Sequence, residues 1–173
     1  MELEINTLIG IVYGAVITLL FSIFFYLIGI KKKEFGCTLI TKTIVSESLG
    51  NYEDLKILYK GMVIKSLYET QIAFINIGNH HIESDDFTLK SITITTDGKF
   101  LIDDIKKIKY KCNDDITVTF EKLSDKQIKM NFDNLSPGEE IYLEMLHTCN
   151  MNVKCKLKEG KVKIYNKHIK SDL

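Results

Sequence analysis

The sequence predicts a mainly β protein, an antiparallel β-sandwich of about 7–9 strands that follows one N-terminal transmembrane α-helix. Three observations support this prediction. Residues 8–30 form an uninterrupted apolar run without a charged side chain. From about Cys37 onward, apolar residues recur at every second position, which is the period of a half-buried strand. Turn-forming residues divide this region into short segments, as is typical of sandwiches and barrels.

The composition excludes several classes of protein. The chain has 173 residues, of which 45% are hydrophobic and 27% are charged, and its formal net charge is zero. It contains no arginine, no tryptophan and a single proline. Disordered, collagen-like and low-complexity chains have other compositions, and four cysteines are too few for a disulfide-dense secreted scaffold. Because the apolar residues are concentrated near the N-terminus, a simple soluble monomer is not expected.

The apolar run from Leu8 to Ile30 is long enough to cross a lipid bilayer. As a helix, its 23 residues would reach about 34 Å, against roughly 30 Å for the hydrocarbon core. A signal peptide is the alternative, but signal peptides begin with basic residues and have a shorter apolar stretch. This chain begins with the acidic residues Glu2 and Glu4. We therefore expect an uncleaved membrane anchor.

The lysines beside this run predict its orientation. Lys31, Lys32 and Lys33 follow it directly, whereas the charged side chains that precede it, Glu2 and Glu4, are both acidic. Because positive residues flank the cytoplasmic end of a membrane helix, we expect a single-pass protein of the cell membrane with its N-terminus outside. The expected segments are an extracytoplasmic N-terminus (1–7), a transmembrane helix (8–30), a juxtamembrane segment with the first strand (31–51) and a cytosolic β-sandwich domain (52–173).

Small residues recur at every fourth position of the predicted helix: Gly10, Gly14, Thr18 and Ser22. Such spacing lets two membrane helices approach closely, so these residues are candidates for helix packing in a homo-oligomer. The alternative is that glycine is simply common in membrane helices.

Three segments show the strand alternation most clearly. In each, one face is apolar and the other polar, so the apolar face is expected to pack in the core. The apolar sets are Ile116, Val118 and Phe120; Ile128, Met130 and Phe132; and Val153, Cys155 and Leu157.

Turn signals separate the expected strands. Asp97-Gly98 is the strongest hairpin signal, because both residues tolerate a positive φ. Further turns are expected at 48–51, 78–79, 113–115, 124–125, 136–138 and 159–160. The apolar pattern changes parity between Leu89 and Ile92, which indicates a bulge near Lys90 and Ser91 or a crossing between sheets.

Two stretches resemble immunoglobulin-like domains. Residues 71–79, Gln-Ile-Ala-Phe-Ile-Asn-Ile-Gly-Asn, are similar to a hydrophobic strand that runs into an Asn-x-Gly-Asn turn. Residues 135–143, Leu-Ser-Pro-Gly-Glu-Glu-Ile-Tyr-Leu, are similar to a later Leu-x-Pro-Gly-Glu turn that enters a strand. Their order fits the fibronectin-type and adhesion-related sandwiches of bacteria, over roughly residues 52–165. The resemblance implies an Ig-like, non-catalytic binding or spacer module, although the Cys–Trp–Cys core of antibody domains is missing.

The sequence offers no recognisable catalytic site. Its glycines do not form a phosphate-binding loop, a dinucleotide fingerprint or a nucleophile elbow. His80 and His81 precede several carboxylates, and we expect them at an exposed loop tip rather than in an acid–base site. We therefore expect no enzyme and no cofactor.

The cysteines match no metal or disulfide pattern. In a reducing cytosol Cys37, Cys112, Cys149 and Cys155 are expected to remain thiols. His147 with Cys149 and Cys155 would supply three ligands, but their spacing fits no zinc site, so we expect no metal.

Five lysines near the C-terminus form the candidate ligand-binding site. Two groups of alternating lysines flank a turn at Glu159-Gly160, and as a hairpin they would share one outer face that attracts an anionic ligand. The alternative is that these lysines protect an edge strand from aggregation. Nucleic acid is not the expected ligand, because aromatic residues for base stacking are missing apart from Tyr165. The candidate residues are Lys154, Lys156, Lys158, Lys161 and Lys163.

Two hypotheses for the function follow. The first is a membrane-anchored interaction module, in which the sandwich binds a cytosolic protein and the helix anchors it in the bilayer or assembles a homo-oligomer. The second is a ligand-gated membrane effector of the prokaryotic antiviral defence type, in which the lysines bind an anionic second messenger and the helices perturb the membrane. An enzyme with unrecognised residues is a third, less favoured hypothesis.

Overall fold

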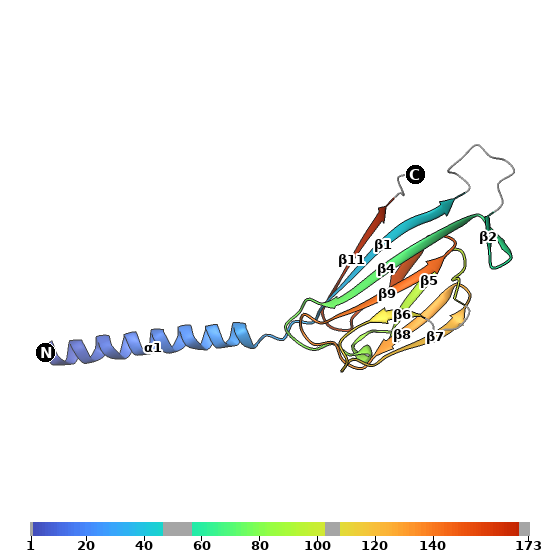
Figure 1. Cartoon of the computed structure of the whole chain (residues 1–173). Helices are drawn as coiled ribbons and strands as arrows, with labels where there is room; N and C mark the ends of the chain where they lie inside the picture. The colour runs from blue at the N-terminus through green and yellow to red at the C-terminus, as the bar shows by residue number, and fades with distance from the viewer. Residues whose placement is uncertain (1, 47–56, 103–107, 170–173) are drawn as a thin grey trace. The chain divides into compact units, whose positions relative to one another are not determined.

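The computed structural model describes residues 2–46, 57–102 and 108–169, and the chain divides into two compact units, Met1–Lys31 and Lys32–Leu173. The first unit is a single helix, α1 (Glu2–Gly29) (Figure 1). Its large apolar side chains are exposed from Ile9 to Tyr26, and this segment is long and apolar enough to cross a membrane. The boundary that we expected near residue 51 lies outside the described residues.

The hydroxyls of Thr18 and Ser22 are satisfied within helix α1. The Thr18 hydroxyl donates to the carbonyl of Gly14, and the Ser22 hydroxyl donates to the carbonyl of Thr18, each at 2.8 Å. Hydroxyls bonded one turn back need no water, so both residues are compatible with apolar surroundings.

The second unit is a sandwich of two sheets (Figure 1). The larger sheet has the order β11-β1-β4-β9-β6, and the smaller one has the order β10-β5-β8-β7. A separate hairpin is formed by β2 and β3. The bounds are β1 (Glu34–Ser46), β2 (Ile57–Tyr59), β3 (Met62–Ile64), β4 (Ser66–Asn76), β5 (Ile92–Thr96), β6 (Lys109–Lys111), β7 (Val118–Ser124), β8 (Gln127–Phe132), β9 (Glu140–His147), β10 (Met151–Lys154) and β11 (Lys161–Ile169), with a short 3₁₀ helix, η2, at Ser84–Asp86.

The predicted strand alternation is confirmed where it was clearest. In β8, Ile128, Met130 and Phe132 are buried between partly exposed neighbours, and Val118 of β7 faces the same core. Phe35 of β1 is fully buried and lies between aromatic rings of both sheets, so one core joins the layers. The mainly β sandwich fold is therefore confirmed, with nine strands in its two sheets.

One strand pair departs from the predicted antiparallel arrangement. Residues Glu34 to Lys42 of β1 pair in parallel with Lys161 to Ile169 of β11. The other pairs in both sheets are antiparallel. The chain leaves the smaller sheet after β10 and enters the larger one beside the start of β1, so β11 runs in the direction of β1.

Two local predictions are corrected. Asp97-Gly98 follows β5 but does not form a tight hairpin, because β5 pairs with β8 and β10. Gly98 instead permits a close approach, since a Cβ there would lie 2.3 Å from Oγ1 of Thr148. The parity change near Lys90 is neither a bulge within a strand nor a crossing between sheets. It is a turn before β5, in which Lys90 has a φ of 52° and its N–H donates to the Phe87 carbonyl.

Candidate functional site

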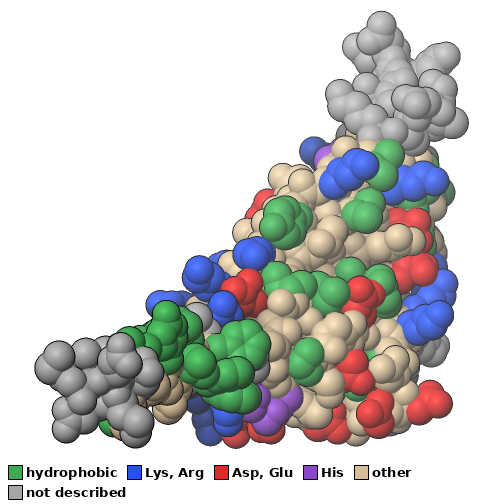
Figure 2. Space-filling model, turned by 90° about the vertical axis from the view of Figure 1, so that its left-hand side faces the viewer, with side chains coloured by type: hydrophobic (Ala, Val, Ile, Leu, Met, Phe, Trp, Pro, Cys, Tyr) green, Lys and Arg blue, Asp and Glu red, His purple; other side chains and the backbone are tan. Residues whose placement is uncertain are grey.

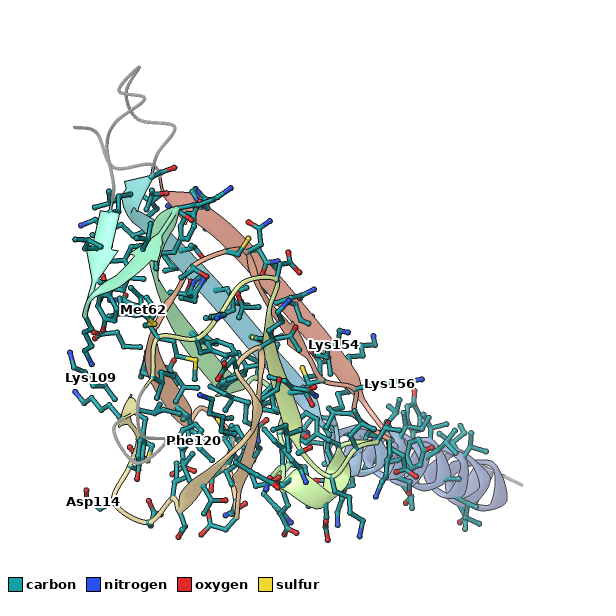
Figure 3. The ribbon with its side chains drawn as sticks, turned by 90° about the vertical axis from the view of Figure 1, so that its right-hand side faces the viewer. Met62, Lys109, Asp114, Phe120, Lys154 and Lys156 are labelled. Carbon is teal, nitrogen blue, oxygen red and sulfur yellow. The ribbon has the colours of Figure 1, made fainter. Side chains whose placement is uncertain are left out.

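The five candidate lysines lie on two sheets instead of one hairpin. Lys154 ends β10 in the smaller sheet, whereas Lys161 and Lys163 belong to β11 in the larger sheet. Lys156 and Lys158 lie on the segment between them, and all five lysines are exposed. Figure 3 shows Lys154 and Lys156 beside each other on one side of the domain, across from Lys109. The hairpin prediction is therefore wrong, although β10 and β11 are both edge strands.

Two contacts direct the chain from one sheet to the other. Leu157 is buried and forms an isolated bridge with Phe87, which holds the segment after β10 against the smaller layer. The chain then passes over Lys33 at Gly160, whose φ is 122°. A Cβ at Gly160 would lie 2.2 Å from the Lys33 carbonyl oxygen. Glycine is therefore required here by both the close approach and the conformation.

Only some of the candidate lysines have fixed partners among the described residues. The Lys158 ammonium donates to the carbonyl of Asp85 at 2.7 Å, and Lys163 pairs with Glu34 at 3.2 Å. Lys154, Lys156 and Lys161 form no ion pair within the described part of the chain. These three lysines therefore carry uncompensated positive charge on β10, on the segment that follows it and on β11.

A third lysine of β11 was missed in the sequence. Lys167 lies on β11 opposite Ile40, on the same outer face as Lys161 and Lys163. The signal was present, because the alternation of Lys161 and Lys163 continues through Tyr165 to Lys167.

The outer face of the larger sheet adjoins this edge. Its middle carries Ile40 of β1, Ala73 and Ile75 of β4, and Tyr142 of β9. Figure 2 shows this face, with hydrophobic side chains across the middle and lysines along both sides. Within the sandwich unit, no described strand covers this face.

An ion pair fixes the entry of the chain into the domain. Lys33 and Asp86 approach to 2.5 Å, and both side chains are largely shielded from solvent. Burial raises the pKa of Asp86, but the hydrogen bond and charge of Lys33, together with the N–H of Glu83, outweigh it and hold the pKa below its ordinary value. On the other side, the N–H of Lys32 donates to Oδ1 of Asn79 at 2.6 Å.

His147 is part of a buried polar chain rather than a metal site. Its Nδ1–H donates to the carbonyl of Cys149, so its Nε2 accepts the proton of the Thr70 hydroxyl at 2.7 Å. The Thr41 hydroxyl in turn donates to Thr70 at 2.8 Å. Both ring nitrogens are occupied, and among the described residues no three His, Cys, Asp or Glu side chains form a metal-binding group.

His80 and His81 lie in a loop as expected, but His81 is exposed whereas His80 is half-buried. His80 and His81 follow β4 in a loop, their ring centroids 4.2 Å apart, and Nε2 of His81 lies 3.7 Å from a carboxylate oxygen of Glu83.

The comparisons with known proteins assign no family. No protein-family model matches the chain, and no curated protein matches it. Several solved structures are similar in part. A biomass-sensing module from an Rsgi-like protein of Clostridium thermocellum has 19% identity and a TM-score of 0.23, over 49% of this chain and 62% of the module. This chain therefore spans less than two thirds of the length of that module.

Two of the others are a CBM3 of Hungateiclostridium clariflavum and the CBM3a-L domain of scaffoldin cipA from Clostridium thermocellum. The first has 12% identity and a TM-score of 0.27, over 66% of this chain and 71% of that protein. The second has 13% identity and a TM-score of 0.26, over 66% and 68%. Likeness at these TM-scores assigns no ligand to this chain.

Proposed function

We propose that this chain is a single-pass membrane protein whose β-sandwich is a non-catalytic binding module for a cytosolic partner protein. The observation that carries the proposal is the surface of α1, which exposes large apolar side chains from Ile9 to Tyr26. An apolar surface of this extent is not stable in water, and a bilayer covers it completely. The lysines at 31–33 favour a cytosolic sandwich.

The sandwich supports the binding role in two ways. It has a core of its own, from Phe35 to Leu157, so it can present a surface independently of the helix. Its larger sheet leaves one face and one long edge uncovered by the described residues. The gated-effector hypothesis relied on one hairpin face with five lysines, and these lysines lie on two sheets. We therefore favour the interaction module, and anion binding by the lysines stays a prediction.

The anchor is tested by membrane extraction of the full-length chain. We expect it to remain in the membrane fraction after alkaline carbonate washing, with an intact mass that includes residues 1–30. A variant with Ile17→Arg and Leu20→Arg should be released, whereas the matched variant Ile17→Leu, Leu20→Ile should stay. A mature chain that begins after residue 30 would identify a cleaved leader and overturn the anchor.

The orientation is tested in sealed vesicles. Protease should digest the sandwich in inside-out vesicles and spare it in right-side-out vesicles, with detergent-opened vesicles as the control. Digestion only in right-side-out vesicles would place the sandwich outside the cell.

Assembly through the helix is part of the same proposal. A Cβ at Gly10 or Gly14 would meet nothing within 4 Å, so this strip of α1 is open to a second helix. Native mass spectrometry in detergent should show an oligomer that Gly10→Ile with Gly14→Ile dissociates. Gly29→Ile serves as the matched control, because Gly29 lies outside the repeated spacing. A monomeric wild-type chain would contradict this part.

A further inference from the structure

The free edge of β11 differs from the other edges of the two sheets. Natural edge strands are protected when they are short, bulged or covered. β6 has three residues and β10 has four, and β7 shifts its register between Lys122 and Ser124. β11 has nine residues, contains no proline and keeps a continuous register with β1. Its lysines are its sole protection within the described part of the chain.

The direction of the backbone groups along β11 can be assigned. The N–H of Lys161 donates to the carbonyl of Lys33 at 3.0 Å, so the peptide groups of Lys161 point toward β1. Successive residues of a strand direct these groups to opposite sides, which places the odd-numbered residues on the β1 side. Hydrogen-bonding groups on the free side therefore belong to Val162, Ile164, Asn166 and His168.

The side chains of β11 are exposed on both faces. On the core-facing side Ile164 is 41% exposed, and on the outer side Tyr165 is 59% exposed. Lys161, Lys163 and Lys167 share the outer face, and one carboxylate, that of Glu34, compensates them through Lys163. A strand added to this edge could therefore form apolar contacts with Ile164 and Tyr165 and would lie beside two uncompensated positive charges, those of Lys161 and Lys167.

In the register that pairs all nine residues of β11, the charges argue against a second copy of this chain as the added strand. In an antiparallel pair centred on Tyr165, Lys163 of each copy would lie opposite Lys167 of the other. Like charges directly opposite one another destabilise a strand pair. In a parallel pair in register, each lysine would lie beside the same lysine of the second chain, which again places like charges next to each other. An acidic strand meets the opposite situation, because carboxylates at alternate positions would face Lys161, Lys163 and Lys167.

We propose that β11 accepts an extended acidic segment of a partner protein as an additional strand on its free edge. This inference rests on the proposed binding function and names its surface and its partner class. Main-chain hydrogen bonds to the even-numbered residues supply affinity, and carboxylates facing Lys161 and Lys167 supply selectivity.

The backbone part is tested with Asn166→Pro in the full-length protein in non-ionic detergent. Proline removes an N–H on the free side and leaves the ladder to β1 intact, a position at which edge strands tolerate proline. The probe is a fluorescent nine-residue peptide that alternates glutamate and threonine, followed by anisotropy. We expect binding to weaken about tenfold or more, with unchanged thermal unfolding. Asn166→Ala, which keeps the N–H, should bind like the wild type.

The charge part is tested with Lys161→Gln and Lys167→Gln together. This variant should bind the acidic peptide more weakly and with less dependence on salt, whereas Lys99→Gln with Lys126→Gln, away from β11, should not. A peptide that alternates lysine and threonine should bind more weakly than the acidic peptide. If the wild type binds both peptides equally well, the proposal is overturned. It is also overturned if Asn166→Pro binds the acidic peptide as well as the wild type does. Loss of an oligomer in Asn166→Pro would identify a second copy as the occupant and also overturns it.

Failure of this inference is distinguishable from failure of the binding function. A photo-crosslinking amino acid is placed at Ile164 in one variant and at Tyr142, on the outer face, in another, both in native membranes. A protein crosslinked from Ile164, with an acidic extended segment at the crosslink, supports the proposal. Crosslinking from Tyr142 alone overturns the β11 edge and keeps the binding module, and no crosslink from either overturns both.

Discussion

The side-chain amide of Asn76 donates a hydrogen bond of 2.7 Å to the carbonyl of Leu135, across 59 positions of the sequence. The same amide donates to the carbonyl of His80, and its oxygen accepts the N–H of Gly78. Asn76 ends β4 and is fully buried, whereas Leu135 precedes the turn into β9. One side chain thus joins the two stretches that resemble immunoglobulin-like domains.

Replacing Asn76 should destabilise the sandwich. In Asn76→Ala, the carbonyls of Leu135 and His80 and the N–H of Gly78 each lose the hydrogen bond to this side chain, and the loss of such buried hydrogen bonds costs about 1–3 kcal/mol. We expect the free energy of unfolding to fall by this amount in urea titrations. Asn152→Ala is the matched control, since Asn152 is exposed on β10 and should change stability by less than about 0.5 kcal/mol. Equal effects of both variants would contradict the role of Asn76.

Gly160 should tolerate alanine less well than Gly138. Both have a positive φ, of 122° and 82°, so alanine is strained at either position, and more at Gly160, because 122° lies further outside the left-handed region that other residues adopt. A Cβ at Gly138 meets nothing within 4 Å, but at Gly160 it collides with the Lys33 backbone. Gly160→Ala should therefore cost clearly more, as measured by thermal unfolding. Similar melting temperatures for the two variants would show that the chain passes Lys33 by another path.

Protonation of His147 should weaken the fold. Burial lowers its pKa below the ordinary value of 6.5, and the hydrogen bond to Cys149 opposes this only in part. The unfolded chain therefore binds the proton more readily, so the stability is complete above pH 6.5 and is lost as the pH falls below it. Urea titrations between pH 7.5 and 5.5 should show this loss.

A non-titrating variant provides the control for His147. His147→Asn should be less stable at neutral pH, because the hydrogen bonds to Thr70 and Cys149 are disturbed, yet it should depend less on pH in this window. An unchanged pH dependence in His147→Asn would assign the effect to other groups.

The thiol of Cys37 should be unreactive in the folded protein. Burial raises the pKa of Cys37, with a further contribution from Cys155, and burial raises the pKa of Cys155 to about 11. Because the thiolate is the nucleophile, maleimide at pH 7.5 should leave Cys37 unmodified until urea is added. Peptide mapping by mass spectrometry follows both cysteines. Rapid native labelling of Cys37 would show that β1 opens frequently.

The local alternation of apolar and polar residues was sufficient to predict the strands, but not which strands pair with one another. Ile128, Met130 and Phe132 alternate because one face of β8 is buried, and this burial is visible in the sequence. The path after Lys154 is decided by Leu157 against Phe87 and by Gly160 against Lys33, which are contacts between distant segments. Two lysine runs around a glycine therefore suggested a hairpin that does not form.

The candidate site was predictable in composition but not in arrangement. The alternating lysines indicated a positive strand, and β11 is one. That β11 pairs in parallel with β1, and so leaves Ile164 and Asn166 on a free edge, depends on the connection between the sheets. The role of His147 in the core was also hidden, because its partner Thr70 lies 77 positions away.

The position of β1 has a mechanical consequence. Only residues 30–33 separate α1 from β1, and β1 lies between β4 and β11. Tension that reaches the domain through α1 therefore runs along the axis of a strand that is held on both flanks. Because β11 is parallel to β1, the start of β1 and the end of β11 lie at opposite ends of the paired strands. A pull between these two points therefore loads their shared ladder in shear, so that its hydrogen bonds resist together, and the lifetime of the fold under such a load follows its unfolding rate.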